Sequence, residues 1–156
     1  MPALTPAWPI VRQALIRLLR SNLVLEGGLP GGWSEGFAPQ GTDYPLGVIS
    51  LHYAPSVYDW TGRVLLIGVD VVIFAKDQGE AARLYSLAFS TLQDAKFTTS
   101  AGQTSLQCRQ TSDISLQDVD TEGKAIREVG GVFEVRVAQS NPALGTLTFT
   151  ADSVIS

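Results

Sequence analysis

The segment from Arg63 to Phe74 constrains the fold more than any other part of this chain, because it reads as one long β-strand with two apolar faces. Its odd-numbered positions from 65 to 73 carry only leucine, isoleucine and valine. Its even-numbered positions from 64 to 74 are also apolar, except for Gly68 and Asp70. Side chains alternate between the two faces of a strand. Such a strand is expected at the centre of a sheet that is covered on both sides.

The remaining pattern predicts an α+β fold in the order α-β-β-α-β-β. Apolar and polar periodicity predicts a first helix that begins at Thr5 or at Ala7-Trp8 and ends near Leu25, and a second from Asp77 to about residue 95. Further strands are predicted at 48–53, 104–111 and 130–138. The second helix begins with a capping box, Asp77 followed by Glu80. We expect a mixed, mainly antiparallel sheet of about four strands with two helices packed on one face. The predicted domain spans residues 1–139, and residues 140–156 form a C-terminal arm or an added strand.

The second apolar face of the predicted sheet must also be covered. With 156 residues, the chain has few elements left after two helices cover the first face, so a neighbouring subunit is the simplest cover and a homo-oligomer is expected. Ile16 lies among arginines on the polar side of the first helix, either as a tolerated surface residue or as a subunit contact. Asp70 is costly in an aliphatic strand unless it is paired. Arg136 or Arg109 is the predicted cation, within one subunit or between subunits.

Two segments lack periodicity and exceed the usual length of a connection. The first, residues 26–47, is rich in glycine but lacks the Gly-Lys-Ser/Thr of a phosphate-binding loop. The second, residues 113–128, is polar and acidic. Its Asp-x-Asp-x-Glu-Gly run from Asp118 resembles half of a calcium loop, yet position twelve is Val129, so no metal site is predicted. We expect these loops to dock partners through Trp33, Phe37, Tyr44, Asp118, Asp120 and Glu122.

Composition excludes several classes of function. The formal net charge of −4 argues against an electrostatic nucleic-acid binder. Cys108 is the single cysteine and His52 the single histidine, so a disulfide framework and a cysteine-zinc cluster are excluded. No Gly-x-Ser-x-Gly elbow accompanies the histidine. We read both residues as structural and expect no enzyme activity, cofactor or metal. Prolines and arginines interrupt the N-terminal apolar run, so neither a signal peptide nor a membrane span is expected there.

The pattern as a whole resembles the tail terminator, or tail completion, proteins of long-tailed bacteriophages. The resemblance covers about residues 8–139. It lies in four segments: the helix Val11-Arg-Gln-Ala-Leu-Ile-Arg-Leu-Leu19, the junction Asp43-Tyr-Pro-Leu-Gly-Val-Ile-Ser-Leu51, the strand and helix from Leu66 to Leu92, and the strand Gly131-Val-Phe-Glu-Val-Arg-Val137.

The resemblance implies a structural virion protein without cofactor, made in the host cytoplasm and located at the head-proximal end of the tail. It implies a ring, usually a hexamer, that caps the tail tube and meets a head-completion or connector protein. DNA would pass through the lumen without specific binding. Two alternatives stay open: another head–tail connector or adaptor protein, and a ferredoxin-like ligand-binding or catalytic domain with the same element order.

Overall fold

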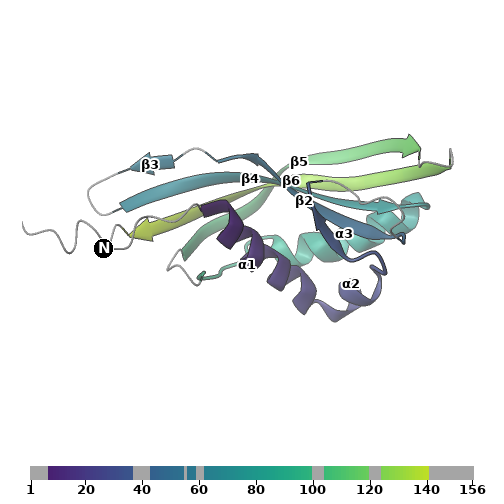
Figure 1. The fold of residues 1–156 in the computed structure, drawn as a ribbon, viewed down its shortest axis with the longest axis horizontal. Helices are drawn as coiled ribbons and strands as arrows, with labels where there is room; N and C mark the ends of the chain where they lie inside the picture. Colours follow the sequence, from purple (N-terminus) through teal and green to yellow (C-terminus); the bar gives the residue numbers. More distant parts are fainter. Residues whose placement is uncertain are drawn as a thin grey trace, which may run out of the picture.

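The computed structural model describes residues 7–36, 43–54, 56–58, 62–99, 104–119 and 124–140. In this part of the chain, helices lie below one curved six-stranded sheet (Figure 1). The elements are α1 Ala7–Ser21, α2 Leu23–Gly27, β1 Trp33–Glu35, β2 Leu46–Tyr53, β3 Ser56–Tyr58, β4 Gly62–Ala75, α3 Gln78–Leu92, β5 Thr104–Val119 and β6 Ala125–Ser140. The predicted α+β class is confirmed, with β1 and β3 as short additions.

The predicted strand is the centre of the sheet. The strand order is β1-β2-β4-β6-β5, and β3 also pairs with β4. β4 is antiparallel to β2 and to β6, and its pairing with β6 runs without interruption from Gly62↔Ser140 to Ala75↔Arg127. β1 pairs in parallel with β2 at one edge. β5 forms the opposite edge, antiparallel to β6.

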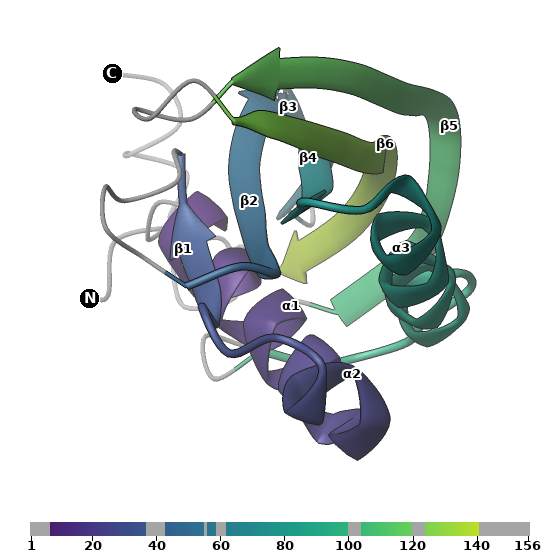
Figure 2. The ribbon, with the colours of Figure 1, turned by 90° about the vertical axis from the view of Figure 1, so that its right-hand side faces the viewer.

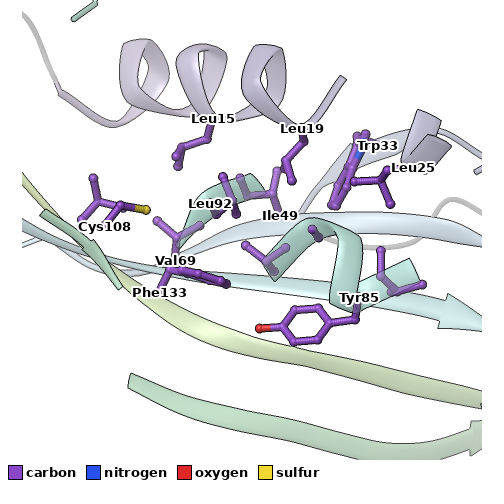
Figure 3. Packing of buried hydrophobic residues seen from close by; sticks show 14 of the residues in the cluster. Leu15, Leu19, Leu25, Trp33, Ile49, Val69, Tyr85, Leu92, Cys108 and Phe133 are labelled. Atoms are coloured by element: carbon purple, nitrogen blue, oxygen red, sulfur yellow. The ribbon is translucent and has the colours of Figure 1, made fainter. Parts of the chain in front are cut away.

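Both long helices cover the same face of this sheet, as predicted. Figure 3 shows leucines of α1 and α3 pointing at β2, β4 and β6. On α3 the buried stripe is the predicted one, and the N-cap forms because Glu80 N donates to Asp77 Oδ2 at 2.9 Å. One cluster of buried side chains joins the three helices with β1, β2, β4, β5 and β6. Its members with no exposed area include Val11, Leu19, Ile49, Ile67, Val69, Val71, Ile73, Leu84, Leu92, Cys108, Val135 and Val137.

The first helix is shorter than predicted, because Asn22 interrupts it. The backbone of Asn22 is extended, and its side chain accepts a hydrogen bond from Leu25 N at 3.2 Å, which caps the short helix α2. The turn buries Leu25 completely and leaves Leu23 80% exposed. None of the described helices is long and apolar enough to cross a membrane.

The β5–β6 hairpin is longer than predicted, and the expectation of an irregular loop over 113–128 is wrong. β5 continues to Val119 and β6 begins at Ala125. Figure 2 shows β5 curving up one side of the molecule and over its top. A register shift in β5 between Gln110 and Ser112 accompanies this curve. On β6, a side chain at Gly130 would overlap the carbonyl oxygen of Val71, so glycine permits the close approach of the two paired strands at this point.

Candidate functional site

The two faces of β4 differ in cover, and this difference defines the candidate interaction surface. The helix face carries the odd-numbered residues 65–73, each 3% exposed or less. The outer face carries the even-numbered residues 64–74. Four of them are apolar and half-buried: Val64, Leu66, Val72 and Phe74.

Part of the outer face is covered by the chain itself. Register places Leu46 beside Phe74 and Val48 beside Val72, so both β2 residues lie on this face. Leu46 is fully buried and Val48 is 5% exposed. Ile126 of β6 is also 5% exposed on this side. A neighbouring subunit is therefore needed, at most, to cover the half-buried residues of this face, and not the face as a whole.

A polar row crosses the outer face next to Gly68. Tyr53 lies directly over that glycine, where any side chain would overlap its ring. The Tyr53 hydroxyl donates to Glu134 Oε2 at 2.9 Å, and Arg136 Nε donates to Glu134 Oε1 at 3.2 Å. Burial raises the pKa of Tyr53, and the hydrogen bond to Glu134 adds to the effect. The row links β2 to β6 across the central strand.

The predicted pairing of Asp70 with an arginine of its own chain is wrong. Arg136 is held by Glu134, and Arg109 Nε donates to Asp94 Oδ1 at 3.2 Å. The ionisable side chain recorded beside Asp70 is instead His52, whose Nδ1 lies 3.5 Å from Asp70 Oδ1.

The Oδ1 oxygen of Asp70 is shielded from solvent and has no hydrogen-bond partner among the described residues. An unbonded buried carboxylate oxygen is unfavourable in an isolated subunit.

Ile16 does not have the exposed position that the sequence suggests. Its side chain is partly buried and packs against the subunit's own core. Arg12, on the same helix, is engaged with Glu35 of β1, and Trp8 Nε1 donates to the same carboxylate at 3.0 Å. α1 thus holds the edge strand β1 in place.

The aromatic residues of the glycine-rich segment lie in different environments. Trp33 is 9% exposed inside the core cluster, so the structure does not present it as a docking anchor. Its ring lies against Gly47, where an added Cβ would be 2.5 Å from Trp33 Cε3. Tyr44 is half-buried, with Lys76 Nζ 6.0 Å from its ring centroid. Phe37 lies outside the described residues.

Of the three acidic residues assigned to docking, only Asp118 lies in the described part of the chain. Asp118 is in β5, paired with Ile126, whereas Asp120 and Glu122 lie outside the described residues. Alternation of Ile114 and Leu116 with Ser115 and Gln117 is the signal that identifies this part as strand.

Ionisable side chains and the single cysteine line one cavity between β5 and the segment that follows α3. Its lining includes Asp94, Lys96, Cys108 and Arg109. The thiol is fully buried, and burial raises the pKa of Cys108 to about 12, so the thiolate needed for nucleophilic attack is scarce at neutral pH. Asp94 and Arg109 pair with each other at the exposed rim. In the described part of the chain, no three histidine, cysteine or carboxylate side chains are grouped as metal ligands.

A second, shallow groove of about 260 Å³ lies between α1 and residues 97–99. Among its described lining residues, Arg17 is the single ionisable one, and Ile10, Leu18 and Phe97 supply most of the apolar surface. It offers no pair of titratable groups for acid–base chemistry.

Comparison with known proteins gives a result for the fold. No profile of a known protein family and no curated protein matches the sequence. Among solved structures, the chain is similar to a chain from a structure described as the virion of a native gene transfer agent particle. The TM-score is 0.60 at 15% identity, over 80% of this chain and 92% of that chain. The two chains share a fold over nearly the whole length of the virion chain.

Proposed function

We propose that this chain is a structural virion protein that forms a ring, caps a phage-type tail tube and joins it to the head connector. The observation that carries the proposal is the fold shared with a gene transfer agent virion chain, which is matched over 92% of its length. The tail terminator resemblance of the sequence supports the finer role. The proposal assigns the protein no reaction and no cofactor.

Self-association is supported by the outer face of β4. Val64, Leu66, Val72 and Phe74 are apolar there but only half-buried. Closed symmetry buries such surfaces in assemblies of identical chains. Asp70 offers an unbonded carboxylate oxygen on the same face. In the proposed interface, Asp70 accepts from a neighbour's donor, Arg136 faces the neighbour, and Ile16 adds the part of its side chain that its own core leaves exposed.

Docking to the tail tube and to the head side is assigned to two segments. The first contains Phe37 and Tyr44, because aromatic anchors contribute strongly to interface energies. The second is the tip of the β5–β6 hairpin with Asp118, Asp120 and Glu122. Its carboxylates act as salt-sensitive rim contacts or as lumen charge that keeps DNA from sticking. The formal net charge of −4 is compatible with such a lumen.

Imaging and mass measurement test the ring and the tail role together. Mass photometry and negative-stain microscopy of the purified chain are expected to show one closed oligomer with a central channel. Producer cells without this protein are expected to accumulate filled heads and tails that stay separate, and supplying the protein should join them. A chain that stays monomeric at high concentration and in tail preparations contradicts the ring. Normal joined particles without the protein contradict the tail role.

Hydrogen exchange tests the docking segments. Residues 37–44 and 118–124 are expected to gain protection when free protein is assembled into tails, whereas α3 should already be protected in both states. If both segments are protected in free protein and gain nothing on assembly, the docking assignment is wrong.

A further inference from the structure

The outer edge of β5 is divided into a bonded half and a free half. Along the first half, Ser105 N donates to Phe97 O at 2.8 Å, and Asp94 N donates to Cys108 O at 2.7 Å. Gln110 N donates to the side chain of Gln93 at 3.1 Å. The segment that follows α3 therefore satisfies the edge from residue 105 to residue 110.

The second half, residues 112–119, has no such cover from the described part of the chain. Its backbone hydrogen bonds with described residues are those of the β6 ladder. The side chains of residues 112–117 are exposed except for half-buried Ile114, and Leu116 is 59% exposed. The stretch contains no proline and no lysine, the residues that commonly blunt an edge. We call residues 112–119 the free edge; it is a template for an added strand.

The free edge specifies the pattern that an added strand needs. Ile114 and Leu116 pair with Gly130 and Glu128, so both point to the outer face. Asp113, Ser115 and Gln117 alternate with them on the other face. A matching strand has two apolar residues two positions apart, flanked by polar residues with high strand propensity.

The chain contains such a segment after its last described strand. Residues 146–150 read Thr-Leu-Thr-Phe-Thr. Leu147 and Phe149 would lie beside the two apolar side chains of the free edge, and the three threonines beside its polar ones. Threonine and phenylalanine are both enriched in strands.

The length of chain between Ser140 and Leu147 indicates whether the segment adds to its own subunit or to a neighbouring one. Ile114 pairs with Gly130, ten residues before Ser140 along β6, which is about 33 Å at the rise of a strand. From Ser140 to Leu147 the chain extends at most about 25 Å. Leu147 therefore falls short of Ile114 in its own subunit, measured along the strand, so the alignment of the two apolar pairs favours the free edge of a neighbouring copy.

We propose that residues 146–150 of a second copy of this chain add to the free edge of β5 as a strand, so that neighbouring subunits exchange C-terminal arms. Strand addition of this kind gains main-chain hydrogen bonds from the edge and specificity from alternate side chains. Because the arm and the edge are different surfaces, the contact is head-to-tail and can close a ring. The inference rests on the self-association within the proposed function and is independent of the tail role.

A pair of introduced cysteines tests the contact. Leu116→Cys/Phe149→Cys is expected to give an oxidised ladder of covalent dimers and larger species on a non-reducing gel. Leu116→Cys/Thr148→Cys is the matched control, because Thr148 points to the opposite face of the added strand, and its ladder should be at least tenfold weaker. The native thiol stays silent, because Cys108 is fully buried.

Each outcome separates the possibilities. A disulfide within one chain, with unchanged mass, overturns the exchange, and so does an absence of cross-linking in an oligomer that forms normally. In both cases the proposed ring survives. A wild-type chain that is monomeric at every concentration overturns the ring and the exchange together.

A charge on the free edge gives an independent measurement. Leu116→Asp is expected to weaken subunit association by at least tenfold in sedimentation while leaving the melting temperature of the dissociated chain unchanged. Leu23→Asp places the same charge at a leucine that is 80% exposed on α2, away from the edge, and should leave association unchanged. Equal association of the two variants contradicts the proposal.

Discussion

Val71 and Val72 are neighbours on β4 with identical side chains, yet they lie in different environments. Val71, on the helix face, is fully buried by this chain's own core, whereas Val72, on the outer face, is half-buried. The helix face is closed by α1 and α3, so its apolar area stabilises the fold. The outer face keeps half-buried apolar side chains and a carboxylate oxygen without a hydrogen-bond partner among the described residues, and these are the features that the proposed interface would use.

The largest loss of stability is expected at Gly130 of β6, where the structure leaves no room for a side chain. Gly130→Ala forces a methyl group into the Val71 carbonyl, where a rigid strand cannot yield. We expect a loss of about 3 kcal/mol in the free energy of unfolding by urea titration. Gly27→Ala is the matched control, because a Cβ there meets nothing within 4 Å. Equal stability of the two variants would show that β4 and β6 do not approach each other at Gly130 as closely as described.

The valine pair measures the comparison directly. Val71→Ala is expected to cost about 2 kcal/mol, since it removes fully buried methyl groups and leaves a cavity. Val72→Ala should cost less than half of this in the dissociated chain, because its side chain is only half-buried. Denaturant midpoints measured below the association threshold provide the test. A larger loss at Val72 would reverse the assignment of the two faces.

The pH dependence of stability tests whether Cys108 is buried on the helix face of the sheet. Burial raises its pKa from 9.0 to about 12. The unfolded thiol ionises first, so the stability that the raised pKa provides is full below about pH 9. It is lost as pH rises toward 12, by about 1.4 kcal/mol per pH unit.

Cys108→Ala removes this dependence. Its stability is therefore expected to fall less steeply than that of the wild type between pH 9 and 10.5 in denaturant titrations. Parallel curves would mean that the thiol is not buried as described.

The smallest effect is expected at the polar residues of the outer face. In the dissociated chain, Asp70→Asn and His52→Ala should each change stability by less than about 1 kcal/mol, because both side chains keep partial solvent exposure. In the assembled ring, Asp70→Asn should weaken association, whereas His52→Ala should not. Thermal melts and mass photometry of both variants decide this, and equal association would remove Asp70 from the interface.

Residue patterns predicted the regular elements well, because each pattern follows from local geometry. The two-sided apolar run of β4 placed it at the centre of the sheet, and Asp77 with Glu80 marked the start of α3. The hairpin was predicted too short, because most residues of its outer part are polar and give little hydrophobic periodicity. Ile114 and Leu116 nevertheless keep the alternation of a strand. The first helix was predicted too long, because Asn22 adopts an extended backbone and caps the separate short helix α2.

The site residues were predicted less well, because their partners depend on register. Asp70 is aligned with Ser50 and Val132 across the sheet, so His52 is nearer than either predicted arginine. Trp33 is in the core because β1 pairs with β2 beside Gly47, which has no side chain to exclude the ring. Neither alignment is encoded by the spacing of residues along one strand.

The sequence by itself determined the class of the fold, the central strand and the buried stripes of the helices, because these follow from side-chain periodicity. Only the tertiary structure decided which apolar face of β4 the chain closes for itself, which partner each charged group finds, and which half of the β5 edge is left unpaired by the described residues. The physical reason is that cover and pairing depend on the curvature of the sheet and on strand register, which bring together residues far apart in the chain.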